Sequence, residues 1–307
     1  MKISIKSIAT LLFALIGLES YSQQEPLYTQ YYNNFSLINP AYSGSHGHFT
    51  ATANIRTQWV GQAGSPETQT FSVHGAMGKN VGLGLSLVHD KVFIWNNTDI
   101  YADFSYAFAV SATSTLSFGL KAGGSFLDVN LQELGISDDP LLNENINKFN
   151  PNLGVGVFYY TDKLYASVST VNLLETTHYD ENSSTSKASD KMVFYLSAGT
   201  VFEMGETLKF RPSFLTRMVA GSPLSTDVSA SFLWNDRLEF ALSHRFNASI
   251  SGLFQVRINN HVKVGYSYDK HTNNLGDYNS GSHEISLLFD LGLKSKNAIK
   301  KKSPFFW

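Results

Sequence analysis

From Val81 onward the sequence repeats one unit: about ten residues in which apolar side chains alternate with small or polar ones, then a turn. The alternating apolar residues of two such runs are Val81, Leu83, Leu85, Leu87, then Ile100, Ala102, Phe104, Tyr106, Phe108 and Val110. Because side chains of a strand point alternately to its two faces, each run predicts a β-strand with one apolar face. A tilted strand of about ten residues spans a hydrocarbon layer. The repeat is typical of a transmembrane β-barrel, although a soluble sandwich, which would bury the apolar face, shares the alternation.

The N-terminus has the layout of a secretory signal peptide. Two lysines precede the apolar run from Ile8 to Leu18, and small residues flank a cleavage site between Ser22 and Gln23. We therefore predict that residues 1–22 are a signal peptide, with a buried N-terminal helix as the alternative. After Ser22 no apolar stretch is long enough for a membrane helix, so an integral membrane form would have to be a barrel.

Composition narrows the class further. The chain has no cysteine, so it offers no disulfide framework, no thiolate metal site and no cysteine for lipid attachment. Charged residues make up 16% of the chain, whereas about a quarter is usual in soluble domains. The formal net charge of -2 gives no electrostatic footprint for a nucleic acid. These observations agree with an exported membrane protein that does not bind nucleic acid.

The alternation and the turn residues predict fourteen strands. We place them at residues 48–60, 68–77, 81–90, 97–110, 114–127, 151–161, 163–173, 191–204, 206–217, 225–235, 237–248, 250–259, 261–270 and 282–293. The fold class predicted from this pattern is all-β, a transmembrane antiparallel β-barrel of about 14 strands.

The connections between these strands alternate in length. After every second strand the link is tight, at Gly78-Lys79-Asn80, Ser111-Ala112-Thr113, Asp162, Gly205, Asp236 and Asn260. Most of the others are longer and polar, notably 128–150, 174–190 and 271–281. Bacterial outer-membrane barrels have an even strand count, short periplasmic turns and longer outer loops. The rhythm therefore predicts an integral outer-membrane protein with both termini in the periplasm.

The alternation also assigns the two faces of the wall. Large apolar side chains would meet lipid: Phe232, Trp234, Leu238, Phe240, Leu242, Phe246, Ile285, Leu287, Phe289 and Leu291. Charged and small side chains would point inward: Lys121, Lys209, Arg211, Ser213, Arg217, Glu239, Ser243, Arg245, Glu284, Ser286 and Asp290. A charge on the lipid side at mid-bilayer costs about 2–4 kcal/mol, so these charges belong in the lumen. The lumen is then either a conducting passage or closed by salt bridges, and the sequence leaves both open.

No group of residues stands out as a catalytic or ligand site. His46 and His48 lie close in sequence, but zinc needs three or four converging ligands. His283 and Glu284 are neighbours on a strand and so point to opposite faces, which argues against a catalytic dyad. The acidic stretch at 133–144 lacks the ordered spacing of a calcium loop. We therefore predict no enzymatic activity, no metal and no cofactor.

The segment before the first strand carries a signature. It reads Tyr-Thr-Gln-Tyr-Tyr-Asn-Asn-Phe-Ser-Leu-Ile-Asn-Pro-Ala-Tyr-Ser-Gly from Tyr28 to Gly44. Further landmarks are Arg56-Thr57-Gln58-Trp59-Val60-Gly61, Gly64, Pro66, Thr68, Arg211-Pro212-Ser213 and Gly281-Ser282-His283-Glu284-Ile285. With these landmarks the chain resembles the PorP/SprF family, outer-membrane proteins of the type IX secretion system of Bacteroidota. The resemblance covers nearly the whole mature chain.

The resemblance implies a function. Family members help a particular secreted protein, often a large adhesin with a type B C-terminal signal, to reach or stay on the cell surface. Relatives also work beside periplasmic peptidoglycan-binding components and beside gliding or secretion-motor components. We therefore expect an outer-membrane barrel of the type IX secretion and gliding motility apparatus, embedded in outer-membrane lipids, with a secreted surface protein as its partner. A small-solute porin or transporter is the alternative.

The signature also supplies the candidate site. Pro40 biases Asn39 away from helical conformation, and Gly44 permits a tight turn. The stretch is too polar for a core strand and too aromatic for a free tail, so it either enters the barrel as a plug or packs under the periplasmic rim. It would contact a partner or merely close the barrel. The candidate partner-binding residues are Asn39, Pro40, Ala41, Tyr42, Arg56 and Trp59.

The chain thus divides into four predicted parts: the signal peptide at 1–22, an N-terminal periplasmic or plug segment at 23–47, the barrel at 48–293 and a tail at 294–307. The tail combines lysines with the aromatic end Phe305-Phe306-Trp307. A basic run is usually solvated, but an aromatic tip is unfavourable in water and would dock in the periplasm.

Overall fold

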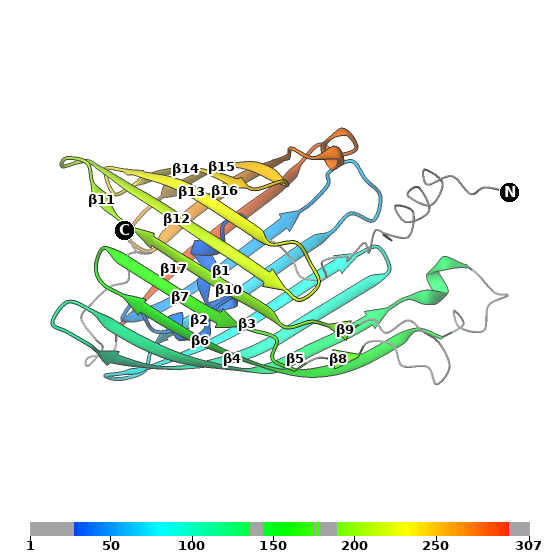
Figure 1. The fold of residues 1–307 in the computed structure, drawn as a ribbon, viewed down its shortest axis with the longest axis horizontal. Helices are drawn as coiled ribbons and strands as arrows, with labels where there is room; N and C mark the ends of the chain where they lie inside the picture. Colours follow the sequence, from blue (N-terminus) through cyan, green and yellow to red (C-terminus); the bar gives the residue numbers. More distant parts are fainter. Residues whose placement is uncertain (1–27, 136–143, 175, 178–188, 295–307) are drawn as a thin grey trace, which may run out of the picture.

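The computed structural model, which describes residues 28–135, 144–174, 176–177 and 189–294, is a closed antiparallel β-barrel (Figure 1). The predicted signal peptide and residues 295–307 of the predicted tail lie outside the described residues. In the described part of the chain, β1 (His48–Thr57) pairs with β17 (Ser282–Lys294), and β10 (Val193–Thr200) pairs with β12 (Leu208–Val219). These two pairings close a wall of fourteen strands, which confirms the predicted class and strand number.

The wall strands follow the predicted ranges closely. The others are β2 (Glu67–Ala76), β3 (Val81–Val92), β4 (Trp95–Ala109), β5 (Thr115–Val129), β6 (Ile146–Tyr160), β7 (Leu164–Thr170), β13 (Ser225–Trp234), β14 (Leu238–Arg245), β15 (Ser249–Arg257) and β16 (Val262–His271). The largest difference is at β6, which begins at Ile146 rather than at residue 151. Outside the wall proper, β11 (Phe202–Glu203) pairs with β12, and β8 (Thr176–Thr177) pairs with β9 (Ser189–Asp190).

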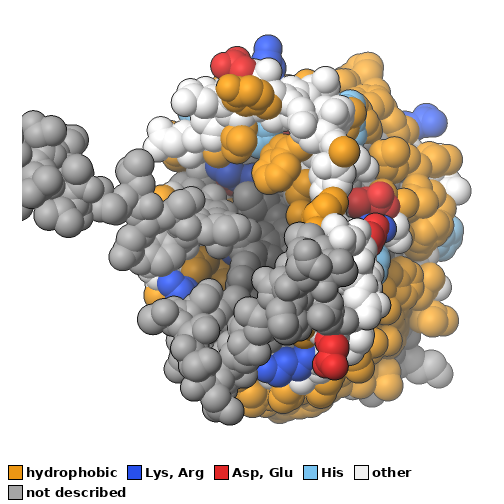
Figure 2. All heavy atoms as spheres, turned by 90° about the vertical axis from the view of Figure 1, so that its right-hand side faces the viewer, with side chains coloured by type: hydrophobic (Ala, Val, Ile, Leu, Met, Phe, Trp, Pro, Cys, Tyr) orange, Lys and Arg blue, Asp and Glu red, His pale blue; other side chains and the backbone are white. Residues whose placement is uncertain are grey.

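The outer surface of the barrel is apolar, as the alternation predicts. Leu242 is 66% exposed and Phe240 48% exposed, whereas Glu239 between two outward neighbours is only 3% exposed. Of the ten side chains predicted to face lipid, nine are exposed and Leu238 is half-buried. Figure 2 shows hydrophobic side chains gathered over the outer wall. A soluble sandwich would bury this face, so that alternative is excluded.

The connections define two mouths. The short-turn mouth carries the links 77–80, 110–114, 161–163, 201–207, 235–237 and 258–261. The long-loop mouth carries 58–66, 130–145, 171–192 and 272–281, but also the shorter links 93–94, 220–224 and 246–248. The predicted rhythm is therefore confirmed at the first mouth and holds only in part at the second. Two of these reversals are tight because Phe93 and Asn247 adopt positive φ angles of 55° and 59°.

The helices of the described residues are short 3-10 segments: η1 (Tyr31–Leu37), η2 (Pro40–Tyr42), η3 (Leu131–Leu134) and η5 (Asn274–Asp277). In the same residues, no helix is long and apolar enough to cross a membrane. η1 is interrupted at Asn34, whose backbone is not helical (φ -134°, ψ 51°). η1 and η2 belong to the segment before β1, whereas η3 and η5 lie in long loops.

Residues 28–47, here called the plug, lie inside the barrel. Phe35 and Ala41 are fully buried, and Tyr42 is 1% exposed, although none of them belongs to the wall. In Figure 1 the blue segment that precedes β1 lies within the ring of strands. Of the two predicted positions, inside the barrel or under its rim, the structure has the first.

The plug crosses the lumen from one mouth toward the other. Thr29 bonds to Glu284 and Asp269, which lie close to the long-loop ends of β17 and β16. Gly44 packs against Gly82, next to the short turn between β2 and β3. The first residue of β1 and the last of β17 share the short-turn mouth, as predicted for the chain ends. The described chain nevertheless begins near the opposite mouth, because the plug traverses the lumen before β1 starts.

Candidate functional site

The candidate functional site is the lumen together with its plug. Locally, the plug folds as its sequence indicates. Asn39 is extended (φ -142°), its side-chain oxygen accepts from the Ala41 N–H at 2.8 Å, and Pro40 opens η2. This is the N-cap arrangement that asparagine and a following proline favour. Gly44 turns the chain in the left-handed region (φ +80°), as predicted.

Glycines of the wall make room for η2 and the turn after it. A Cβ on Gly119 of β5 would overlap the backbone nitrogen of Ala41. A Cβ on Gly156 of β6 would overlap the side-chain oxygen of Asn39, and one on Gly82 of β3 would overlap the carbonyl of Ser43. The wall thus lacks side chains at the places where the backbone or cap of the plug approaches it most closely.

Polar side chains of the wall satisfy the plug backbone. Asn39 Nδ2 donates to Ser167 Oγ at 2.7 Å and to the carbonyl of Val157 at 3.1 Å. Ser169 Oγ donates to the carbonyl of Ile38 at 2.5 Å. Buried carbonyl and amide groups need hydrogen-bond partners. Because these partners are particular wall residues, the bonds hold the plug at one position in the lumen.

A buried charge cluster lies at the long-loop end of the plug. Arg56 of β1 lies 2.6 Å from Asp269 of β16 and 3.0 Å from Glu284 of β17. The Glu284 carboxylate also accepts from the backbone N–H of Thr29 at 3.0 Å and of Gln30 at 3.2 Å. Thr29 Oγ1 accepts from Arg56 and donates to Asp269. The cluster therefore links three wall strands and the start of the plug.

Two further buried ion pairs touch the plug. Arg211 of β12 lies 2.8 Å from Glu239 of β14, and its guanidinium carbon is 4.7 Å from the centre of the Tyr32 ring. Lys121 of β5 lies 2.7 Å from Asp103 of β4, and Ser43 Oγ donates to the same carboxylate at 3.4 Å. The predicted inward charges Arg211, Glu239 and Lys121 are thus each paired with an opposite charge inside the barrel. Of the two predicted lumens, the described residues form the salt-bridged one.

An aromatic core joins the plug to the wall. Phe35 packs against Tyr42, Phe158 and Tyr165 with ring centres 5.2–6.1 Å apart. Phe158 and Tyr165 point inward from β6 and β7 and are 0% and 1% exposed. This aromatic core could not be predicted from the alternation, because the inner face of the wall was expected to carry small or charged side chains. The available signal was the run 155–160, where both faces of one strand carry large side chains.

Histidines gather near Tyr42. Its hydroxyl lies 2.6 Å from His46 Nε2, and the rings of His46 and His74 are 5.0 Å apart. Burial raises the pKa of the Tyr42 phenol well above its ordinary value, so the group stays a neutral hydroxyl beside His46. Among the described residues, no group of three or more His, Asp or Glu side chains could hold a metal ion.

Most of the predicted partner-binding residues are buried in the lumen. Asn39 and Ala41 are fully buried, and Pro40, Tyr42 and Arg56 also belong to the buried set. These five residues build the plug and its charge cluster.

Trp59 differs from the other five. It follows β1 in the loop 58–66, is half-buried and has a left-handed backbone (φ 48°). The next residue, Val60, donates to the carbonyl of Gly281 at 3.0 Å and accepts from the N–H of Ser280 at 2.9 Å. Trp59 thus lies where the loops 58–66 and 272–281 are joined, at the long-loop mouth.

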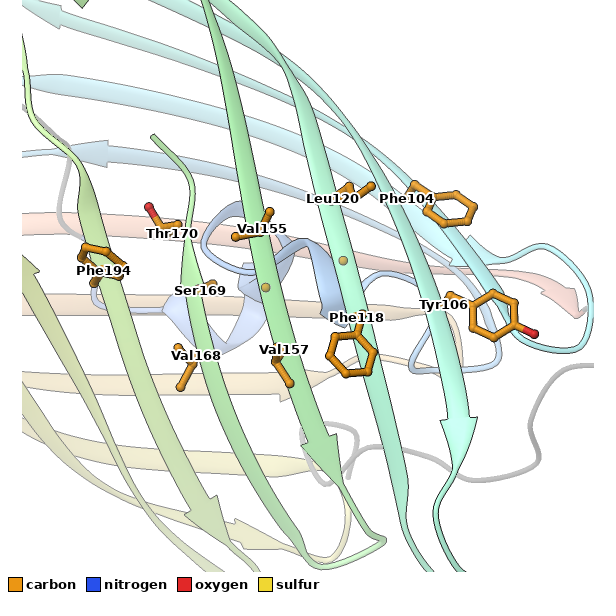
Figure 3. A pocket seen from close by; sticks show the side chains of 12 residues that line it. Phe104, Tyr106, Phe118, Leu120, Val155, Val157, Val168, Ser169, Thr170 and Phe194 are labelled. Carbon is orange, nitrogen blue, oxygen red and sulfur yellow. The ribbon is translucent and has the colours of Figure 1, made fainter. Parts of the chain in front are cut away.

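The outer wall carries an apolar groove over the part of the wall that contacts η2 from inside (Figure 3). Its volume is about 460 Å³, and its lining includes Phe104, Phe118, Leu120 and Phe194. Gly119 and Gly156, which contact the plug from the inner face, also line this groove. The wall is therefore thin here, with lipid-facing side chains on one side and η2 on the other.

Comparison with solved structures finds outer-membrane proteins and channels that are similar to this chain at low sequence identity. The outer membrane protein Omp33 of Acinetobacter baumannii has 9% identity and a TM-score of 0.48, over 81% of this chain and 100% of that one. The CymD monoaromatic hydrocarbon channel has 12% identity and a TM-score of 0.48, over 90% and 96%. A FadL homologue of Pseudomonas aeruginosa has 12% identity and a TM-score of 0.47, over 82% and 92%.

Sequence comparison gives a sharper result. No curated protein matches the chain. The model of one protein family, described as type IX secretion system membrane protein PorP/SprF, matches residues 20–289. This range includes the plug and almost the entire barrel, and it agrees with the resemblance drawn from the signature and its landmarks. The chain therefore belongs to the PorP/SprF family of type IX secretion system membrane proteins, and it is an outer-membrane β-barrel.

Proposed function

We propose that this barrel presents or retains a particular secreted surface protein, such as a large adhesin, at the cell surface, and that it has no enzymatic role. The main observation in support of this proposal is that the plug fills the lumen. The plug is anchored to Glu284 and Asp269 at one end and packs against Gly82 toward the other. A small-solute porin, the alternative, needs a water-filled passage through this space. The partner would therefore engage the barrel from outside the lumen.

The joined loops 58–66 and 272–281 are the contact surface in this proposal. Besides the Val60 bonds, the Gln62 side chain donates to the carbonyl of Tyr278. Tyr278 is 73% exposed and Leu275 47% exposed. Exposed aromatic and apolar side chains at the end of a barrel suit a protein contact. Long loops face outward in outer-membrane barrels, so a surface protein would meet this mouth.

The other five candidate residues, Asn39, Pro40, Ala41, Tyr42 and Arg56, act indirectly in this proposal. They hold the plug, and the plug supports the long-loop mouth through Thr29 and the charge cluster. The short-turn mouth would face the periplasmic peptidoglycan-binding and secretion-motor components.

Deletion of the gene tests the proposal. We expect one or a few surface proteins to disappear from the cell exterior while general secretion continues, as measured by surface proteomics. Loss of uptake of a small nutrient, with every surface protein in place, would instead favour the porin.

A point variant tests the contact surface itself. Trp59→Asn suits the left-handed backbone at this position, because asparagine tolerates that region. We expect it to lose the surface partner while the barrel still folds, as judged by its heat-modifiable migration in gels. The control is Trp234→Asn, which changes an exposed tryptophan at the last residue of β13, at the opposite mouth. Equal retention of the partner by both variants would contradict the proposed surface.

A further inference from the structure

One signature residue, His283, points away from the lumen, whereas its neighbours Ser282 and Glu284 are buried inside it. Two tyrosines of β16 hold the imidazole on the outer wall. The Tyr266 hydroxyl lies 2.7 Å from His283 Nδ1, and the ring centre of Tyr268 is 5.2 Å from that of His283. When the tyrosine hydroxyl donates to Nδ1, Nε2 carries the proton and can donate to a ligand.

Lys270 places a cation next to this histidine. Tyr268 is directly opposite His283 in the ladder, and Lys270 follows two residues later on the same face of β16. Diagonal neighbours of this kind are within reach of long side chains. Lys270 is exposed and forms no ion pair in the part of the chain that the structure describes. The outer wall therefore carries an ammonium and an imidazole N–H side by side.

The carboxylates next to these two residues in sequence do not neutralise them. Asp269 and Glu284 point into the lumen, where they are 1% and 0% exposed. Both are paired with Arg56, at 2.6 and 3.0 Å. The buried cluster and the outer patch thus lie on opposite faces of the same strands.

Outward carboxylates near this mouth are also separate from the patch. Glu67 is two strands away from His283 in the same register row and is directly opposite Lys91 on β3. Asp277 belongs to η5, and no ion pair joins it to Lys270 among the described residues. The patch formed by Lys270, His283 and the two tyrosines is therefore free to take an anion.

The patch lies at the border of the apolar wall. Toward the short-turn mouth the outward side chains are apolar, as at Phe254, Ile285 and Leu287. Toward the other mouth the strands end, since β16 stops at His271 and β17 starts at Ser282. Tyrosines are enriched at the level of the lipid head groups, and the long loops of outer-membrane barrels face outward. This border therefore belongs to the outer leaflet.

We propose that the patch binds the phosphate of an outer-leaflet lipid between Lys270 and His283, with the acyl chains of the lipid along the apolar wall. An ammonium binds phosphate as a compact charge, and the imidazole N–H adds a directed hydrogen bond. A lipid, rather than free phosphate, is the ligand because apolar side chains continue directly from the patch. The inference goes beyond the retention of a surface protein, since it concerns the lipid-facing wall.

Native mass spectrometry of the full-length barrel in a non-ionic detergent tests the proposal. The probes are phosphatidic acid and diacylglycerol with the same acyl chains, added in equal amounts. We expect phosphatidic acid to be retained about fivefold better, the factor that one lysine near an anionic membrane surface provides. Equal retention of the two lipids would overturn the proposal. Excess inorganic phosphate should leave the lipid bound, and complete displacement would show that the site takes free phosphate instead.

Matched variants assign the preference to the patch. Lys270→Gln should bring the retention of the two lipids close to equality. His283→Phe keeps a ring between the tyrosines without the N–H and should lower the preference, whereas His283→Gln keeps a donor and should lower it less. The control is Lys91→Gln, which removes an exposed outward lysine at the same mouth, opposite Glu67, and should keep the full preference.

Heat-modifiable migration in gels shows that each variant is folded before its lipids are compared. The full preference in folded Lys270→Gln would overturn the proposal. An equal loss in Lys91→Gln and Lys270→Gln would do the same, because it would reflect the overall charge of the barrel rather than this patch.

Discussion

Arg56 on the first strand of the wall and Glu284 on the last lie 3.0 Å apart, and both are buried. The same carboxylate accepts from the backbone of Thr29 in the plug, and the same guanidinium donates to the Thr29 hydroxyl. One ion pair thus fastens the seam between β1 and β17 and the start of the plug. Because both charged side chains of the pair are buried, removal of either one leaves the other as a buried charge without its counter-ion.

The first prediction concerns this pair. Arg56→Met should destabilise the folded barrel by about 3–5 kcal/mol, because Asp269 and Glu284 then stay buried without their cation. Urea titration of the refolded protein measures the change. The control is Lys163→Met, since Lys163 is 57% exposed and pairs with Glu203 at 3.4 Å near the surface. An exposed pair contributes at most about 1 kcal/mol, so similar losses in both variants would disagree with the role given to Arg56.

The second prediction concerns the wall glycines that make room for η2. Gly119→Val should push η2 away from the wall, at a cost of about 1–3 kcal/mol for overpacking, and should open a path for ions. Single-channel recording in planar bilayers should show higher conductance than for the wild-type barrel. Gly252→Val is the control, because a Cβ at Gly252 meets nothing within 4 Å. If both variants conduct like the wild type, the plug does not depend on the close contact at Gly119.

The third prediction concerns the direction of the plug. Because the chain has no cysteine, single cysteines report their own exposure. In intact cells a membrane-impermeant maleimide should label Ser65→Cys in the loop 58–66 and Tyr28→Cys at the start of the plug. It should label Lys79→Cys, in a short turn, only after the outer membrane is permeabilised. Labelling of Tyr28→Cys only in permeabilised cells would place the start of the plug at the periplasmic mouth.

The fourth prediction compares neighbours on β14. Phe240→Arg should impair membrane assembly by up to about 2–4 kcal/mol, because Phe240 points to lipid. From the sequence alone, Glu239→Gln would be mild. The ion pair with Arg211 changes that expectation to a loss of about 3–5 kcal/mol, because Arg211 is 2% exposed. Folded fraction in liposomes separates the two effects: the arginine variant should fail to insert, whereas the glutamine variant should insert but unfold at lower urea concentration.

The barrel itself could be predicted because the sequence patterns that specify it, strand alternation and turn residues, each involve residues close together in the chain. Alternation fixes the face of each side chain, and tight turns at Gly78 and Asp236 fix where strands reverse. The tightness of the turn at Phe93 could not be predicted in this way, because an aromatic residue with positive φ has no compositional cue.

The position of the plug could not be predicted either. Its signature indicated an unusual segment, and Asn39, Pro40 and Gly44 adopt the local conformations expected of them. Whether that segment lies inside the barrel or beneath it depends on contacts such as Asn39 with Ser167, which are 128 residues apart. Neither alternation nor turn chemistry reports contacts of that range.

The charge cluster at the seam has a consequence for the order of assembly. Thr29 is synthesised among the earliest of the described residues, but the carboxylate that receives it is 255 residues further along the chain. Contacts at such separation require closure of a long loop and are intrinsically slow to form. We therefore expect the start of the plug to become anchored only when the last strand brings Glu284 to the seam. Because Glu284 binds both Arg56 of the first strand and Thr29 of the plug, closure of the seam and anchoring of the plug should be coupled in folding.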